Sequence, residues 1–456
     1  MAKKKQIELT IEEKLQNTLV PKEEQPYKIP SNWCWSYWKY CGKFIAGNGF
    51  KNIYQGFTQY DIPYYKVGSL KFCDEGNYLI DETNTINEEI RTKLKAVKIP
   101  VNSIIFAKIG EAIKLNRRCL NKIECCIDNN LMAFISEKYF YKYIFYWTKS
   151  LNFYELTNAT TVPALRKTDL ENIPIPLPPL NEQQRIVNII ESLFAKLDRA
   201  KELIENTLVQ FEQNKMAILH KAFTGELTVK WRKENNIDLS SWQEKTIDEL
   251  CTSLKYGTSK KSNPEGSVVV LRMGNLQNGE IDWSNLMYTD DKDDIEKYLL
   301  KKGDVLFNRT NSPELVGKTS IYRGEYPAIY AGYLIKLDYG KDIIGEYLNY
   351  IMNSTKAKHY CYTVKTDGVS QSNINAKKIG AFEIPVPTIE EQQEIVNILD
   401  RLLAKYNKIK NLEQQLEKIE LLKKAILAKA FRGELGTNNP DEESAENLLK
   451  EILAEK

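Results

Sequence analysis

The chain has 456 residues, 42% of them hydrophobic and 27% charged, which is enough for about two to four domains with cores of their own. Its net charge of +3 is far below that of a protein that coats DNA electrostatically, so any nucleic-acid contact needs local basic clusters or partner subunits. No run of about 18 apolar residues occurs, and the N-terminus lacks the apolar core of a secretory signal, so we expect a cytoplasmic protein without a membrane span.

The cysteines and histidines are too scattered for a zinc site. A zinc cluster needs closely spaced thiolate or imidazole ligands, and the chain has no C-x-x-C pair and only two histidines, His220 and His359. We therefore expect no bound metal and mostly buried, reduced thiols at the cysteines, which are Cys34, Cys41, Cys73, Cys119, Cys125, Cys126, Cys251 and Cys361.

Composition and helix punctuation divide the chain into six consecutive segments. We predict an N-terminal extension with a helix (1–25), a globular domain (26–180), a long helix with a linker (181–240), a second globular domain (241–387), a second long helix (388–436) and an acidic tail (437–456). The tail ends in a short amphipathic stretch, which we interpret as a solvated helix or a contact with a partner.

The two globular domains repeat the same short phrases in the same order. "YYKVGSL" (64–70) resembles "VLRMGNL" (270–276), "VNSIIFAKIGE" (101–111) resembles "KGDVLFNRTNS" (302–312), and "ENIPIPLPPLNEQQ" (171–184) resembles "GAFEIPVPTIEEQQ" (380–393). Short β-branched runs such as "GSVVVLRMG" predict strands, and stretches such as "YFYKYIFYWTKSL" predict helices. We predict an α+β fold that arose by tandem duplication of one unit, a mixed α and β domain followed by a long helix.

Each long helix begins with nearly the same nine residues, "EQQRIVNII" from Glu182 and "EQQEIVNIL" from Glu391, which lie 209 positions apart. Prolines precede both segments and a glycine follows each of them, as is typical of helix ends. Apolar residues then recur at intervals of three and four, the pattern of a coiled-coil seam. We predict that the seam residues hold the two helices together as an antiparallel pair; they include Ile190, Leu193, Leu197, Ile204, Phe211, Leu399, Leu402, Ile409, Leu416 and Ile419. The alternative is that each helix packs only on its own domain.

Basic and amide side chains accompany the repeated phrases in both domains. Arginine can bind guanine in the major groove and Asn or Gln can bind adenine, while lysine more often holds phosphate. The alternative for any single residue is a solvated surface charge. The candidates for DNA contact are Lys66, Ser69, Lys108, Lys114, Arg117 and Arg166 in the first domain, and Lys260, Lys261, Arg272, Asn275, Arg309, Asn311, Lys318 and Gln371 in the second.

Motifs for catalysis are missing from the sequence. There is no G-x-x-x-x-G-K-[ST] phosphate loop, no H-E-x-x-H metal motif and no N-P-P-[YF] motif of adenine methyltransferases, and two histidines leave little room for a His-based triad. We therefore predict no catalytic residues in this chain.

Several of these phrases resemble a known family. "LPPLNEQQRIV" closing a variable domain, a long helix ending in "AFTGELT" with "WR" just beyond it, and a second copy with "VPTIEEQQEIV" and "AKAFRGEL" are similar to the specificity subunit of type I restriction–modification systems. "GDVLFNRTNSPELVGK" also looks like a target-recognition domain of that family. The resemblance extends from about residue 27 to about residue 436.

The resemblance implies a non-catalytic DNA-binding subunit of a complex. Two target-recognition domains would each read one half of a split, asymmetric site in double-stranded DNA, and the helices, related by pseudo-two-fold symmetry, would set the spacing between the halves. Two modification subunits carrying S-adenosylmethionine and two restriction subunits using ATP and Mg would supply the chemistry, so this chain would bind no cofactor itself.

Two other readings compete with this one. A stand-alone nuclease–methyltransferase would need a cofactor fold and a catalytic motif within the chain, and neither is visible. A coiled-coil scaffold that binds only proteins would give a complex that retains no DNA sequence selectively.

Overall fold

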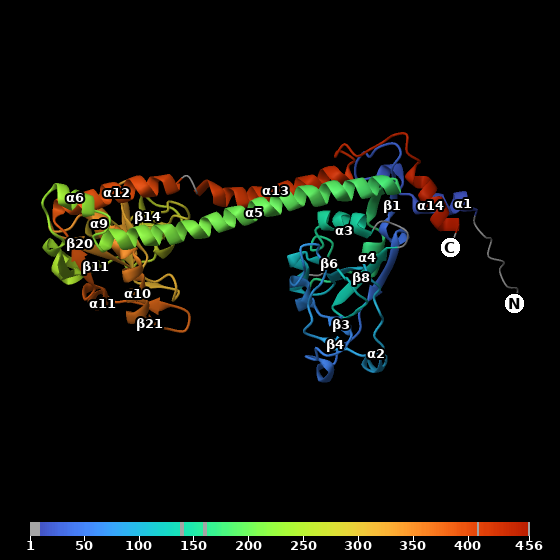
Figure 1. Cartoon of the computed structure of the whole chain (residues 1–456), viewed down its shortest axis with the longest axis horizontal. Helices are drawn as coiled ribbons and strands as arrows, with labels where there is room; N and C mark the ends of the chain where they lie inside the picture. The colour runs from blue at the N-terminus through green and yellow to red at the C-terminus, as the bar shows by residue number, and fades with distance from the viewer. Residues whose placement is uncertain (1–9, 137–140, 158–161, 408–409, 455–456) are drawn as a thin grey trace. The chain divides into compact units, whose positions relative to one another are not determined.

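The computed structural model describes residues 10–136, 141–157, 162–407 and 410–454, and it divides into two compact units. The first unit comprises Met1–Glu202 and Gln415–Lys456, and the second comprises Leu203–Gln414. Each unit contains one globular domain together with parts of both long helices (Figure 1).

The first domain is built from three small sheets. A four-stranded antiparallel sheet has the order β2-β8-β5-β6, a three-stranded sheet has the order β4-β3-β7 with β3 and β7 parallel, and a ribbon pairs β1 with β9. The strands are β1 (Cys34–Tyr37), β2 (Gly42–Ala46), β3 (Ile62–Tyr65), β4 (Thr85–Ile86), β5 (Ile104–Ala107), β6 (Arg118–Leu120), β7 (Cys126–Ile127), β8 (Leu131–Ser136) and β9 (Pro174–Leu177).

The second domain repeats this topology strand for strand. Its sheets have the orders β11-β20-β16-β18, β15-β12-β19 with β12 and β19 parallel, and β10-β23. Two further small sheets, β13-β14 and β17-β22-β21, belong to this domain. The strands are β10 (Gln243–Thr246), β11 (Cys251–Tyr256), β12 (Val268–Leu271), β13 (Leu276–Gln277), β14 (Glu280–Ile281), β15 (Tyr288–Thr289), β16 (Val305–Asn308), β17 (Thr310–Asn311), β18 (Thr319–Ile321), β19 (Ala328–Tyr330), β20 (Leu334–Tyr339), β21 (Thr366–Asp367), β22 (Ser372–Asn373) and β23 (Glu383–Val386). The predicted α+β fold with an internal duplication is confirmed at the level of strand order.

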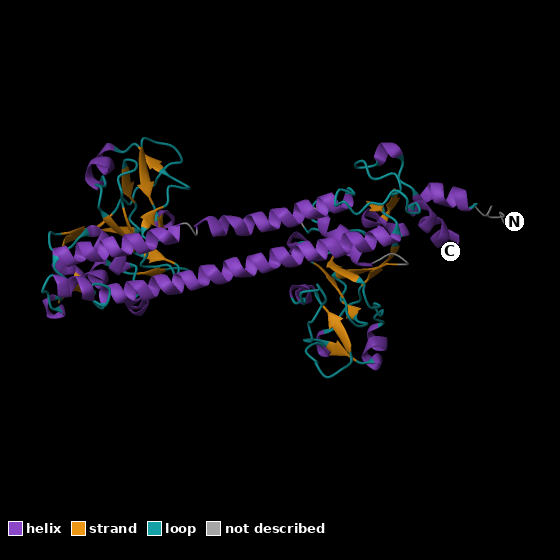
Figure 2. Cartoon of the chain, turned by 45° about the horizontal axis from the view of Figure 1, so that its top comes forward, coloured by secondary structure: helices purple, strands orange, loops and turns teal. Residues whose placement is uncertain are grey.

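Short helices cover the sheets and join the strands (Figure 2). They are α1 (Ile11–Thr18), α2 (Glu88–Leu94), α3 (Tyr141–Ser150), α4 (Lys167–Glu171), α6 (Val229–Glu234), α7 (Ile247–Leu250), α8 (Lys292–Tyr298), α9 (Gly345–Met352), α10 (Thr355–Val364), α11 (Ala376–Gly380) and α14 (Ala445–Ala454). In the first domain the fully buried Trp38 packs edge-on against Phe44 and Trp147, between the four-stranded sheet and α3. Such aromatic contacts stabilise a core beyond the area they bury.

The long helices are α5 (Leu180–Phe223), α12 (Ile389–Asn407) and α13 (Lys410–Phe431). In the first unit α5 and α13 run antiparallel, because Asp198 pairs with Lys423 (2.5 Å) and Lys201, one turn further along α5, pairs with Glu420 (3.7 Å). Figure 1 shows the two helices side by side in this unit.

The predicted seam residues fall into three groups. Ile190 and Leu399 are fully buried and belong to the cores of the first and second domain, so these helices also pack on their domains. Ile419 is buried, and Ile409 lies outside the described residues. The others are half-buried, and they are Leu193, Leu197, Ile204, Phe211, Leu402 and Leu416. Their pairwise contacts remain a prediction.

The repeated "EQQ" phrase makes the same contacts in both units. The Gln183 side-chain amide donates to the Pro178 carbonyl (3.0 Å), and Gln392 donates to the Pro387 carbonyl (2.9 Å). Each glutamine thereby binds an unpaired carbonyl of the proline-rich exit, which lies outside any strand or helix ladder. These bonds tie the first turn of each long helix to the proline-rich segment that precedes it.

The C-terminal tail packs on the first domain, so the interpretation of a solvated helix is wrong. Helix α14 lies beside α1 (Figure 1), and its residues Ala445, Leu449 and Ile452 are buried in the core of the first domain. The Arg185 guanidinium donates two hydrogen bonds of 2.7 Å to the Glu442 carboxylate, which ties the start of the tail to α5. The sequence pattern of α14 was amphipathic, but only the fold supplies the surface that its apolar face covers.

Candidate nucleic-acid interface

A tight turn after β3 and β12 presents a basic residue at equivalent positions. Lys66 and Arg272 precede the 3₁₀ turns η4 (Val67–Lys71) and η7 (Met273–Asn275). The Lys66 backbone N–H donates to Ser69 Oγ (3.0 Å), and the Arg272 N–H donates to Asn275 Oδ1 (2.9 Å). Both accepting side chains are buried, and the Asn275 amide also donates to the carbonyls of Asp282 and Ser284. Ser69 and Asn275 thus shape the turns that hold the basic residues, and direct DNA contact by either remains a prediction.

The two basic side chains are only lightly held. Lys66 Nζ donates to Gln55 Oε1 (2.7 Å), and Arg272 Nη2 donates to the Asn285 carbonyl (2.6 Å). Both residues are half-buried, and within the described residues no ion pair joins either of them to a carboxylate, while the buried Arg272 Nε has no hydrogen-bond acceptor. Their positive charges therefore remain available to a ligand.

A second equivalent pair follows β5 and β16. The Leu165 N–H donates to the Lys108 carbonyl (2.8 Å), and the Ile374 N–H donates to the Arg309 carbonyl (2.9 Å). The same backbone contact therefore places a basic residue beside the segment that leads out of each domain. Arg166, exposed at the start of α4, directly follows Leu165 in that segment.

Arg309 is held more firmly than Lys108. Its Nη2 donates to Asn373 Oδ1 (3.0 Å), and its guanidinium lies 4.9 Å from the ring centre of Tyr256, within the range of a cation–π contact. Tyr256 is not among the candidates predicted from the sequence, although it lies only four residues before Lys260. A flat ring under a guanidinium restricts its orientation and leaves its outer N–H groups free to donate.

The sheet β17-β22-β21 carries two amide candidates beside Arg309. Asn311 is half-buried on β17, where its Oδ1 accepts from the Ser312 N–H (2.8 Å). Gln371 is exposed in the hairpin between β21 and β22, whose turn is closed by the Gly368 N–H donating to the Gln371 carbonyl (2.8 Å). The structure thus brings Arg309, Asn311 and Gln371 to one small sheet.

The remaining candidates differ in what holds their side chains. Lys260 pairs with Asp291 (2.7 Å), whose carboxylate raises the pKa of the lysine, and Lys114 pairs with Glu111 (2.7 Å), which raises its pKa in the same way. Lys318 Nζ donates to Gln277 Oε1 (2.9 Å). Lys261 and Arg117 are exposed. Lysines already paired with carboxylates have less charge to offer a phosphate.

The described residues contain no gathering of three or more His, Cys, Asp or Glu side chains that could hold a metal ion. Within the same ranges the eight cysteines form no disulfide, and six of them are buried, in line with the prediction of mostly buried thiols. No described helix is both long and apolar enough to cross a bilayer.

Comparison with known proteins identifies the family. The model of the type I restriction modification DNA specificity domain matches residues 52–208 and again 240–421, one match for each half of the duplication. The specificity subunit of the EcoKI type I restriction enzyme of Escherichia coli (strain K12) is 30% identical over 315 residues, covering 66% of this chain and 68% of that protein. The StySPI specificity subunit of Salmonella potsdam is 29% identical over 335 residues, covering 69% and 71%.

Solved structures share the fold at low sequence identity. A chain from a study of assembly and conformational transition of the type I R-M system has a TM-score of 0.66 at 19% identity, covering 90% of this chain and 100% of that one. The HsdS subunit from Thermoanaerobacter tengcongensis has a TM-score of 0.50 at 19% identity with the same coverage. Since the family model covers most of the chain in two tandem matches, the chain belongs to the type I restriction–modification DNA specificity family, as a non-catalytic subunit that recognises DNA.

Proposed function

We propose that the first domain (26–180) and the second domain (241–387) each read one half of a bipartite, asymmetric site in double-stranded DNA. The observation that carries this proposal is the pair of equivalent basic positions, Lys66 with Arg272 and Lys108 with Arg309, held by the same backbone hydrogen bonds in both domains. Because these turns and backbone hydrogen bonds are equivalent, both domains would approach a DNA groove in the same orientation. The side chains at these positions differ, so the two domains would read different base sequences.

The chemistry of each candidate fits a particular role in groove reading. The Arg309 guanidinium, stacked on Tyr256, is suited to the O6 and N7 acceptors of guanine, and the exposed Gln371 amide is suited to adenine N6 and N7. Exposed lysines and Arg117 would hold phosphates and set the register of the domain on the duplex. The proposed DNA-contact set is Lys66, Lys108, Lys114, Arg117, Arg166, Lys260, Lys261, Arg272, Arg309, Asn311, Lys318 and Gln371, with Ser69 and Asn275 supporting the turns.

The long helices fit a spacer and a docking surface for partner subunits. We propose that two modification subunits with S-adenosylmethionine and two restriction subunits using ATP and Mg join this chain in the cytoplasm. Partners that close around DNA would add phosphate contacts, which accounts for the small net charge of +3 on this chain.

Exchanging residues 241–387 for the corresponding domain of another specificity subunit tests the proposal. The expected result is a methylated motif in which one half changes and the other stays, because each domain reads its half independently. Sequencing methylated adenines in cells that carry the hybrid complex measures this, and the reciprocal exchange of residues 26–180 should alter the opposite half. An unchanged motif in both hybrids, with active complexes, would refute half-site reading.

A charge on the helix seam should loosen the selection of spacer length. Leu197 is half-buried on α5, and a glutamate there would place an ionised group against apolar side chains, which is unfavourable without a partner. We expect Leu197→Glu to broaden or abolish methylation across a series of DNA sites with altered spacers. Leu203→Glu is the matched control, since Leu203 is 51% exposed on the same helix and should keep the native profile. A native profile for Leu197→Glu would count against the spacer role.

A further inference from the structure

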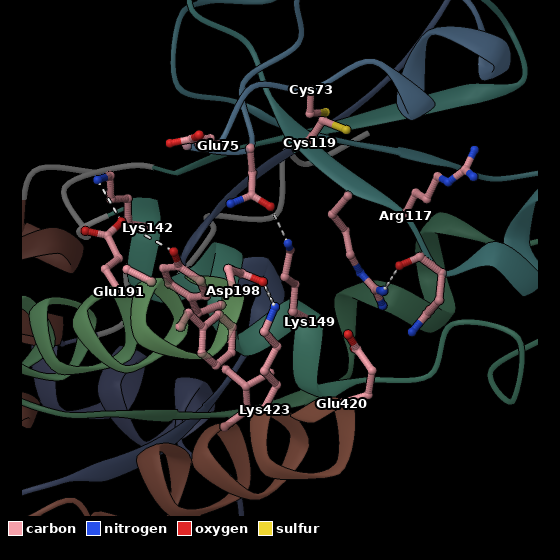
Figure 3. A pocket seen from close by; sticks show the side chains of 18 of the residues that line it. Cys73, Glu75, Arg117, Cys119, Lys142, Lys149, Glu191, Asp198, Glu420 and Lys423 are labelled. Carbon is pink, nitrogen blue, oxygen red and sulfur yellow. Dashed lines mark hydrogen bonds and ion pairs between the residues drawn. The ribbon is translucent and has the colours of Figure 1, made fainter. Parts of the chain in front are cut away.

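A pocket of about 1190 Å³ lies in the first unit, between the first domain and the helices α5 and α13. Its walls carry paired ions such as Asp198 with Lys423, and also Arg117 and Lys149. Figure 3 shows two cysteines, Cys73 and Cys119, next to each other at the wall of this pocket, with their sulfur atoms turned together. Neither cysteine belongs to the proposed DNA-contact set.

The two thiols are in direct contact although they come from different segments. Cys119 lies on β6 and is buried, and Cys73 lies in the loop after η4 and is half-buried. The Cys119 S–H donates to the Leu70 carbonyl oxygen (3.5 Å), and it also interacts with the neighbouring Cys73 sulfur, which shifts the pKa values of both thiols. Both cysteines line the pocket, and Cys73 is the more exposed of the two.

The surroundings favour the thiolate at the exposed member of the pair. The hydrogen bond from Cys119 lowers the pKa of Cys73, and the positive charges of Lys149 and Arg117 lower it further. The same hydrogen bond and burial raise the pKa of Cys119. Burial also lowers the pKa of Lys149 to about 8, so this lysine is still largely charged near neutral pH. Thiolates, rather than thiols, are the nucleophiles in cysteine oxidation.

We propose that Cys73 and Cys119 form an oxidation site that reacts with hydrogen peroxide and closes to an intramolecular disulfide. The Cys73 thiolate attacks one peroxide oxygen, the O–O bond breaks, and the second oxygen leaves as hydroxide, which takes up a proton to become water. Cys73 is then a sulfenic acid. The Cys119 sulfur attacks the Cys73 sulfur, the S–O bond breaks, and the departing hydroxide takes the Cys119 proton as a second water. The two sulfurs together lose two electrons, and the peroxide gains them.

The bond would fasten the loop after η4 to β6. Lys66, a proposed DNA-contact residue, directly precedes η4. The cross-link would therefore connect the segment that carries Lys66 to the four-stranded sheet through β6. Closing a long loop of this kind reduces the freedom of the unfolded chain. A disulfide sulfur separation of about 2.05 Å requires the two thiols to move closer than van der Waals contact. Cys73 lies outside the named strands and is held there by a single β-bridge to Leu79.

The other cysteines provide internal controls. Cys125 and Cys126 adjoin each other in sequence but are fully buried, so peroxide has no access to them. Cys251 is half-buried like Cys73, but burial raises its pKa to about 12, with the carboxylates of Asp248 and Asp338 contributing. If solvent exposure alone determined reactivity, Cys251 would be oxidised as readily as Cys73. If reactivity requires a thiolate, only Cys73 of the two should be oxidised.

Peroxide treatment of the intact full-length protein, followed by alkylation and mass spectrometry without reductant, tests the proposal. We expect the loss of two alkylation sites, a mass lower by about 2 Da for the two hydrogens removed, and a tryptic species joining peptides 72–91 and 119–122. Dithiothreitol should restore both sites. Cys119→Ser should stop at a sulfenic acid on Cys73 that dimedone labels, Cys73→Ser should give neither product, and Cys251→Ser should behave as the native protein.

Three results would overturn the proposal. They are alkylation of both Cys73 and Cys119 in full after peroxide treatment, a cross-link that survives Cys73→Ser, and oxidation of Cys251 as fast as that of Cys73. Far-UV circular dichroism and melting of the serine variants check that each is folded. Cys73→Ala, which leaves no hydrogen-bonding group, repeats the test at the more exposed position. The outcome is independent of the DNA-reading proposal, because the readout is chemical and needs no DNA.

Discussion

Replacing Glu391 with glutamine is expected to destabilise the second unit by about 3–5 kcal/mol, the usual cost of breaking a buried ion pair. Glu391 lies in the first turn of α12 with no solvent exposure. Its Oε1 accepts from Arg232 Nη1 (2.7 Å) and from Thr228 Oγ1 (2.6 Å), and its Oε2 accepts from Trp242 Nε1 (2.8 Å). A glutamine fits the space, but it leaves the buried Arg232 guanidinium without the carboxylate it pairs with and turns one acceptor into a donor.

The duplication supplies a matched control at Glu182. This carboxylate is equally buried, but its donors are all neutral, namely Trp33 Nε1 (2.8 Å), Thr437 Oγ1 (3.0 Å) and Asn438 Nδ2 (3.0 Å). Glu182→Gln therefore leaves no buried cation behind, and we expect a smaller loss of about 1–3 kcal/mol. Urea unfolding followed by hydrogen exchange, resolved on α9 and α3, reports the two units separately.

The relative stabilities of Glu391→Gln and Glu182→Gln test whether Arg232 is the essential partner of Glu391. If Glu391→Gln costs no more than Glu182→Gln, the guanidinium is not an essential partner of the carboxylate. The double variant Glu391→Gln with Arg232→Met removes both charges, and it should recover part of the stability that Glu391→Gln loses. Failure to recover any would place the cost in Thr228 and Trp242 instead.

This pair of glutamates also shows what the sequence could and could not predict. The doubled "EQQ" phrase predicted two equivalent helix starts, but the partners of the glutamates come from segments far along the chain. Thr228 and Thr437 occupy the same place in the two units, yet "GELT" has become "GELGT", and one inserted residue hides the match. The acidic, amphipathic sequence of the tail predicts a solvated helix or a contact with a partner, whereas Thr437 and Asn438 donate hydrogen bonds to Glu182.

The candidate DNA-contact residues also include some that the sequence could predict and some contacts that it could not. Repeated phrases located the turns with Lys66 and Arg272, because the turn sequence is local. That Ser69 and Asn275 accept the backbone N–H of those basic residues follows from the dihedral angles of the turn, which composition does not reveal. The stacking of Arg309 on Tyr256 joins two strands that are distant in sequence, and no local pattern predicts it.

The glycines that follow the long helices could, by contrast, be predicted from the sequence, because ending a helix depends only on local backbone conformation. Gly225 and Gly433 adopt positive φ of +78° and +74°, the left-handed conformation that ends many helices. A Cβ atom at Gly225 would also meet the end of the exposed Leu239 side chain at 2.5 Å, so a substitution there strains the backbone and requires that side chain to move.

Replacing Arg309 with alanine is expected to weaken binding of the assembled complex to its own site by roughly 10- to 100-fold, since a bidentate arginine–guanine contact is worth about 1–3 kcal/mol. The methylated motif should also relax at one base of the half-site read by the second domain. Equilibrium binding to native and substituted duplexes, together with sequencing of methylated adenines, measures both effects. Arg323→Ala is the matched control, because Arg323 is an arginine of the same domain that is already bound to Glu280 and Glu346.

Arg309→Lys separates recognition of a base from attraction to phosphate. Lysine keeps the positive charge but has neither the planar fork nor the flat surface that lies on Tyr256 and donates to Asn373. If Arg309 reads a base, lysine should resemble alanine in motif and in discrimination, while binding to unrelated duplex stays at the native level. If Arg309 only holds phosphate, lysine should restore native binding and alanine should reduce the salt dependence of binding by about one charge. The two roles thus predict opposite results for a single substitution, because the fork distinguishes bases and the charge does not.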